Sequence, residues 1–199
     1  MPDFYKRTFE VRAAADKAGR ITGKPIVFDS RTNLGYFDEI IEAGALDNAD
    51  ISDVRFLVNH DLNKIPLARA RANDPESTMK IIVGRDGMHI DVDLDVENNA
   101  EAKALHSAVQ RGDISGMSFM FSIDGERWED LESEHPTRRI TAIGAVMEVS
   151  AVTFPAYNDT EISARDYKSA LENARRSCEN IHTESVELEK LKAKYIFNI

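Results

Sequence analysis

Three short segments far apart in the chain supply residue types that together can activate a nucleophile. A serine hydroxyl becomes a useful nucleophile only when a neighbouring base takes its proton. An imidazole does this best when a third, acidic group fixes its tautomer and supports its positive charge. The residues that could fill these three roles are His60, Ser118 and Glu148. The sequence therefore raises the question of whether a fold brings the three side chains together.

Each of these residues also has a plain structural interpretation. His60 follows the apolar run 54–58, and a histidine at such a place can simply bond a local neighbour. Glu148 lies inside the apolar run 145–152, where a carboxylate is costly unless it is paired or hydrogen-bonded. It could instead point outward from an amphipathic strand, together with Ser150 on the same face.

Ser118 opens a stretch typical of a strand and could be a half-buried serine that bonds a neighbour. It is not in the Gly-x-Ser-x-Gly elbow of α/β-hydrolases, because Met120 replaces the last glycine. Ser115, at the preceding turn, is a competing nucleophile if the strand register differs.

Most of the chain up to about residue 160 is predicted to be β-structure. Alternation of apolar and polar residues, or short β-branched and aromatic runs, predicts strands at 4–14, 21–29, 54–58, 79–83, 89–96, 114–123 and 144–154. The segment 84–87, which contains two glycines, joins two of these strands into a hairpin. Residues 98–111 carry an apolar stripe at helical spacing, between a capping asparagine and Gly112.

The expected class is therefore mainly β with flanking helices (α+β), and short strands separated by turns favour a closed or nearly closed barrel. We divide the chain into a β-barrel domain at 1–160 and a charged tail at 161–199. The tail is rich in Glu, Lys, Ser and Asn, with Leu188, Leu191 and Tyr195 at helical spacing. It is expected to be an exposed helix or partly disordered.

Composition excludes several function classes. The net charge of −10 argues against a phosphate backbone as the main ligand, so we expect no nucleic-acid partner. No apolar run approaches 20 residues and the N-terminus has no apolar core, so we expect neither a membrane span nor a secretion signal.

We also expect no metal and no cofactor. The single cysteine, Cys178, permits no intramolecular disulfide and argues against a cysteine-based zinc site. There is no His-Glu-x-x-His, P-loop or Gly-x-Gly-x-x-Gly motif. The alternating acids of 91–97 lack the glycine and the ligand spacing of an EF-hand, and are better explained as a solvated strand face.

Three blocks of the sequence, in this order, resemble tailed-phage prohead maturation proteases of the HK97 type. The histidine block is Phe-Leu-Val-Asn-His-Asp at 56–61 followed by Pro-Leu-Ala-Arg at 66–69. The serine block is Gly-Asp-Ile-Ser-Gly-Met-Ser-Phe-Met-Phe at 112–121, and the third block is Glu-Val-Ser-Ala-Val-Thr-Phe-Pro-Ala-Tyr at 148–157. The upstream Gly-Ala-Leu at 44–46 also fits, and the resemblance covers roughly residues 4–160.

The resemblance implies a herpesvirus-assemblin-like β-barrel and a serine endopeptidase. It would trim the phage major capsid protein and scaffold domain, and process itself, inside the assembling prohead in the host bacterial cytoplasm. Ser118 would be the nucleophile, His60 the general base and Glu148 the third member. Family members often carry glycine where this chain has Met120 and Ala68, and Met120 would narrow the space for a substrate backbone. Arg69 is a candidate to hold an oxyanion or a carboxylate, and backbone N–H groups near Ser118 or at 138–144 are candidate oxyanion donors.

Two alternatives stay open at this stage. The same barrel could be a non-catalytic capsid-assembly or scaffold-binding module, with the tail as its docking element. Alternatively, the enzyme could be switched on by association, as a homodimer or by docking of the tail at 160–199 to scaffold, with later trimming of that tail.

Overall fold

The computed structural model describes residues 4–9, 14–15, 19–154, 167–180, 184 and 187, and the fold is given for these residues. They are mainly strand with helical segments, as the sequence predicts. Among the described residues no helix is both long enough and apolar enough to span a membrane.

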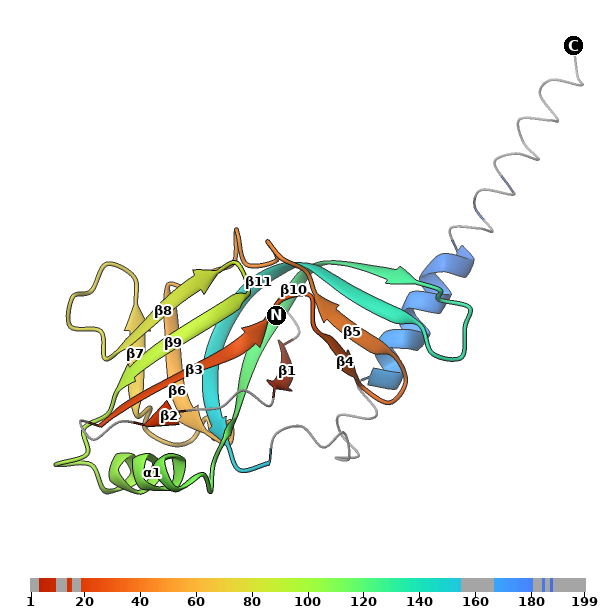
Figure 1. The fold of residues 1–199 in the computed structure, drawn as a ribbon. Helices are drawn as coiled ribbons and strands as arrows, with labels where there is room; N and C mark the ends of the chain where they lie inside the picture. The colour runs from red at the N-terminus through yellow and green to blue at the C-terminus, as the bar shows by residue number, and fades with distance from the viewer. Residues whose placement is uncertain are drawn as a thin grey trace, which may run out of the picture. The chain divides into compact units, whose positions relative to one another are not determined.

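The strands form two sheets (Figure 1). The larger, seven-stranded sheet has the order β1-β10-β11-β5-β4, and β6 joins it by pairing with both β11 and β7. The smaller, four-stranded sheet has the order β2-β3-β9-β8. The larger sheet consists of β1 (Phe4–Phe9), β4 (Arg31–Asn33), β5 (Asp38–Ile41), β6 (Asp53–Val58), β7 (Ala68–Arg71), β10 (Gly116–Glu129) and β11 (Thr137–Val152). The smaller sheet consists of β2 (Ala14–Ala15), β3 (Arg20–Val27), β8 (Met79–Gly84) and β9 (Gly87–Asp93).

The closed barrel suggested by the strand pattern is not observed, because the ladders of the described strands do not close on themselves. The predicted hairpin is present as β8 and β9, paired antiparallel from Met79 with Val92 to Gly84 with Gly87. The strand predicted at 114–123 extends further, to Glu129, and the strand predicted at 144–154 begins earlier, at Thr137.

The one helix predicted before residue 160 is confirmed as α1 (Ala100–Arg111). The Asn99 side chain accepts hydrogen bonds from the backbone N–H groups of Glu101 and Ala102, which would otherwise lack intrahelical partners. Gly112 ends the helix with φ of 80°, a left-handed conformation that glycine adopts without a steric penalty.

The chain divides into two compact units, and the first holds the main core. It comprises Met1–Arg31, Ile40–Arg127 and Arg139–Tyr157. Side chains from both sheets and from α1 form one apolar cluster, in which the largest fully buried residues include Phe56, Phe119 and Phe121.

Gly23 on β3 allows a close approach to the strand that carries Ser118. A Cβ atom at this position would overlap the Sδ and Cε atoms of Met117, the first residue before Ser118. The β3–β9 register also shifts between Gly23 and Ile26, which marks a local irregularity of the ladder. Gly23 therefore leaves the space that the buried end of the Met117 side chain occupies.

The second unit comprises Thr32–Glu39, Trp128–Arg138 and Asn158–Ile199. Its core contains Phe37, whose ring meets the ring of Trp128 edge-on at 4.9 Å and the ring of Tyr167 at 6.0 Å. Arg138 and Glu39 are both buried and form an ion pair of 3.5 Å.

Residues 167–180 of the predicted tail are helical, but they are not wholly exposed. Leu171 is buried against Leu34 and Phe37, and Arg175 donates hydrogen bonds to the carbonyl oxygens of Leu131 and Ser133. The predicted helical stripe of Leu188, Leu191 and Tyr195 lies outside the described residues. The division of the chain at residue 160 stays a prediction.

Replacing Gly23 by alanine should lower the free energy of unfolding by about 1–3 kcal/mol, because the added methyl group forces Met117 out of its packed position. Urea unfolding of Gly23→Ala measures this change. Gly84→Ala is the matched control, since a Cβ atom there meets its nearest neighbour, the Asp86 carboxylate, at 3.3 Å. Equal losses for the two variants would contradict the proposed tight packing at Gly23.

Candidate active site

The parallel pairing of β6 with β11 determines where His60 and Glu148 lie. Glu148 is aligned with Arg55, and Ala151 with Val58, at the last residue of β6. Parallel strands run in the same direction, so the residues that follow β6 lie beside the second half of β11. His60 comes two residues after β6 and can therefore reach back to Glu148.

The turn after β6 is unusual, because two successive residues other than glycine have positive φ. The φ angles are 53° at Asn59 and 57° at His60. Such conformations cost free energy for L-residues, least for asparagine, and persist only where the surroundings impose them. Here the Asn59 N–H donates to the Ala151 carbonyl oxygen at 2.9 Å, and the Asn59 side chain is bonded to the backbone and hydroxyl of Thr153 at 2.9 and 3.0 Å. The end of β11 thus holds the His60 turn in place.

Glu148 is fully buried and both of its carboxylate oxygens are occupied. Oε1 lies 2.5 Å from His60 Nδ1, and Oε2 accepts a hydrogen bond of 2.5 Å from the Ser150 hydroxyl. The same Ser150 oxygen accepts a bond of 3.1 Å from the backbone N–H of His60. Ser150 therefore ties the carboxylate to the histidine backbone as well as to the ring.

Ser118 lies on β10, and its oxygen is 2.6 Å from His60 Nε2. The hydroxyl also contacts the Arg7 carbonyl oxygen at 2.8 Å, on the neighbouring strand β1. A hydroxyl has one proton, so it donates either to the imidazole or to this carbonyl. Ser118 is fully buried, whereas 12% of the His60 side chain is exposed.

This arrangement fixes the histidine tautomer. A carboxylate only accepts hydrogen bonds, so Nδ1 of His60 carries the proton that faces Glu148. Nε2 is then the bare nitrogen that faces Ser118. The three side chains form one connected chain of hydrogen bonds, serine to imidazole to carboxylate, which is the geometry needed to activate an alcohol as a nucleophile.

Comparison with known protein families identifies the chain. Residues 7–174 match the family described as caudovirus prohead serine protease. The chain belongs to this family. The match covers most of the chain and includes His60, Ser118 and Glu148. No curated protein and no solved structure gives a significant match.

Membership of a serine peptidase family makes this chain a serine protease of phage capsid maturation, which acts within the assembling prohead. It favours the peptidase interpretation of the sequence over the non-catalytic binding module.

Among the described residues, no group of three or more His, Cys, Asp and Glu side chains could hold a metal ion.

The three side chains predicted from the sequence meet in this prohead protease, although their catalytic roles stay a prediction. Ser115, the competing nucleophile, is exposed in the segment before β10, and the His60 ring contacts Ser118. Ser150 was not singled out from the sequence. Its position two residues from Glu148, on the same strand face, was the available signal.

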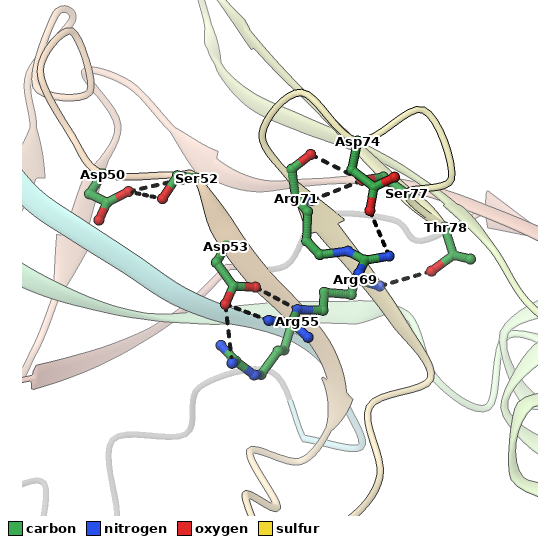
Figure 2. Close-up of polar contacts among 9 residues, drawn as sticks. All are labelled: Asp50, Ser52, Asp53, Arg55, Arg69, Arg71, Asp74, Ser77 and Thr78. Carbon is green, nitrogen blue, oxygen red and sulfur yellow. Dashed lines mark hydrogen bonds and ion pairs between the residues drawn. The ribbon is translucent and has the colours of Figure 1, made fainter.

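Arg69, the candidate to hold an oxyanion or a carboxylate, binds a carboxylate of the protein itself. The guanidinium of Arg69 on β7 is bonded to Asp53 on β6, through Nε at 2.6 Å and Nη2 at 2.7 Å (Figure 2). Arg55 also reaches the same carboxylate, at 3.2 Å. Arg69 is therefore engaged between neighbouring strands. The candidate oxyanion donors at 138–144 belong to β11, where they lie within the sheet instead of in a loop.

The Asp53–Arg69 pair should give the protease a modest, pH-dependent stabilisation. The hydrogen bond from Arg69 lowers the pKa of Asp53 in the folded state, so the contribution is present above the unfolded pKa and is lost as pH falls through the lowered value. Both side chains are about two-fifths exposed, so screening by solvent keeps the effect small.

Urea unfolding of Asp53→Asn should therefore show a small loss of stability at pH 7, and the difference from the unmodified protein should shrink below about pH 4. Asp93→Asn, at an exposed aspartate on β9, is the matched control. A loss that grows on acidification would contradict the assignment.

Proposed function

We propose that Ser118, His60 and Glu148 form the catalytic triad of an endopeptidase. The observation that carries this proposal is the pair of contacts made by one imidazole, to the serine oxygen at 2.6 Å and to the buried carboxylate at 2.5 Å. The family match independently supports serine peptidase chemistry. Glu148 is the third member in this scheme, and Ser150 is a positioning residue that acts through it.

The mechanism follows from the two contacts of the His60 ring, Nε2 with Ser118 Oγ and Nδ1 with Glu148 Oε1. Ser118 Oγ attacks the carbonyl carbon of the scissile peptide bond while its proton passes to His60 Nε2, and Glu148 stabilises the imidazolium. The tetrahedral intermediate collapses as His60 gives that proton to the leaving amine, which leaves an ester on Ser118. Water, deprotonated by His60, then attacks the ester and releases the carboxyl product and the free serine.

We also infer that residues 1–160 form the catalytic domain with a herpesvirus-assemblin-like fold, in which the described strands make two sheets that do not close into a barrel. The mainly β composition and the meeting of three sequence-distant strands at one site support this inference. The tail at 161–199 is then an appended segment that docks the enzyme to scaffold and is later trimmed.

The proposed substrates are the phage major capsid protein and its scaffold domain, cleaved inside the prohead in the host bacterial cytoplasm, together with the protease itself. The proposal includes no nucleic-acid partner and no cofactor, and activation by association, for example as a homodimer, stays an open alternative. The support is the family's role in prohead maturation, the net charge of −10 and a mechanism that uses side chains alone.

The nucleophile can be identified with a fluorophosphonate probe, which bonds to an activated serine. Ser118→Ala should abolish labelling and cleavage of a co-expressed capsid protein, because it removes the oxygen that attacks the carbonyl carbon in the proposed mechanism. Ser115→Ala is the matched control and should retain both. Labelling that survives Ser118→Ala and disappears with Ser115→Ala would reassign the nucleophile to Ser115. Cleavage that persists in both variants would contradict the proposed triad.

Ser150→Ala should lower kcat about tenfold with KM little changed, because it removes one bond to the Glu148 carboxylate and one to the His60 backbone. Ser150→Thr, which retains the hydroxyl, should recover part of the loss. Ser122→Ala removes another buried hydroxyl, bonded to the N–H of Ala145 on β11, and should have little effect on kcat. A kcat as low in Ser122→Ala as in Ser150→Ala would show that the effect is a general loss of packing.

A further inference from the structure

A pocket of about 450 Å³ lies between the segment that follows β6 and the helix α1. One wall comes from the end of β6 and the residues after it, including Leu57, Ile65 and Leu67. The other comes from the face of α1 that carries Ala104 and Leu105. Its volume falls in the range of sites that bind small groups.

Several residues that line the pocket lie close in sequence to His60 or Ser118. Asn59 and Asp61, which line it, are the residues on either side of His60. Ile114, another lining residue, comes four residues before Ser118. An extended chain advances about 3.3 Å per residue, so four residues span about 13 Å. A polypeptide bound at Ser118 can therefore bring one of its nearby side chains to this pocket.

The residues that line the pocket favour an apolar occupant. Most lining side chains are aliphatic. Of the three charged lining residues, Lys64 is bonded to Glu101 at 2.7 Å, and the Asp61 carboxylate accepts a hydrogen bond of 3.1 Å from the Asn63 N–H. The hydrogen bond with Glu101 raises the pKa of Lys64, so its ammonium group stays charged and satisfied by Glu101. Ile65 is 82% exposed, which is a large apolar surface that an occupant of the pocket would cover.

We propose that this pocket binds an aliphatic or aromatic side chain of the substrate polypeptide, within about four residues of the scissile bond. The assignment rests on the proposed function and adds the substrate feature that the protease recognises. The occupant is a substrate side chain because two lining residues, Asn59 and Asp61, flank His60 in the sequence. A third, Ile114, lies just before the strand that carries Ser118.

The experiment compares cleavage of one peptide library by the full-length protein and its variants. Ala104→Phe fills the pocket from an exposed position on α1, and Ile65→Ser removes apolar surface from the opposite wall without disturbing the core. Gln110→Phe, exposed on the same helix, and Leu62→Ser, 57% exposed in the same segment, are the matched controls outside the pocket.

We expect the unmodified protein to prefer a large apolar residue at one fixed position near the cleaved bond. In both pocket variants, the ratio of kcat/KM for large over small side chains at that position should fall about tenfold, the effect of losing apolar contacts in such a pocket. The two controls should keep the original ratio.

Fluorophosphonate labelling of the unmodified protein separates the two proposals. A labelled protein whose pocket variants cleave with the original ratio overturns the pocket assignment and leaves the proposed function standing. A protein that is neither labelled nor able to cleave any peptide overturns the function and the pocket together. Loss of self-association in the pocket variants, without a change in the ratio, would assign the pocket to a second copy of the chain instead.

Discussion

The site depends on the burial of one carboxylate. Glu148 has no solvent contact, and a charge in that position is tolerated only when protein groups replace the water that it has lost. His60 and Ser150 supply those groups, one to each oxygen. The same bonds that make the buried acid tolerable also orient the imidazole. The hydrogen bonds that stabilise the buried carboxylate are therefore the same ones that the proposed catalytic role of His60 requires.

The three side chains can meet only because strands that are distant in sequence bring them to one place. The parallel ladder of β6 and β11 brings His60 to Glu148, and the larger sheet places β10 and its Ser118 beside β11. The left-handed turn at Asn59 then swings the ring toward both partners. Backbone strain is concentrated at the residue whose orientation matters most, and the bonds between Asn59 and Thr153 maintain it.

Local patterns in the sequence predicted the elements whose determinants are local. The alternation along β9 and the caps of α1 are encoded by adjacent residues, so these elements were found close to their true bounds. The candidate site was predicted from residue types that can together activate a serine and from the resemblance of their three segments to prohead proteases. The open arrangement of the sheets, the burial of Leu171 and the engagement of Arg69 by Asp53 depend on long-range contacts, and no short pattern encodes them.

The contact between the Ser118 hydroxyl and the Arg7 carbonyl has a consequence for reactivity. A proton shared between two competing acceptors is available to the imidazole for only part of the time. The Arg7 carbonyl on β1 thus competes with the imidazole for this proton, and a movement of β1 away from β10 would remove this competing acceptor. Strand β1 is thus placed to modulate the reactivity of the Ser118 hydroxyl, which is distant from it in sequence but in contact with it in the fold.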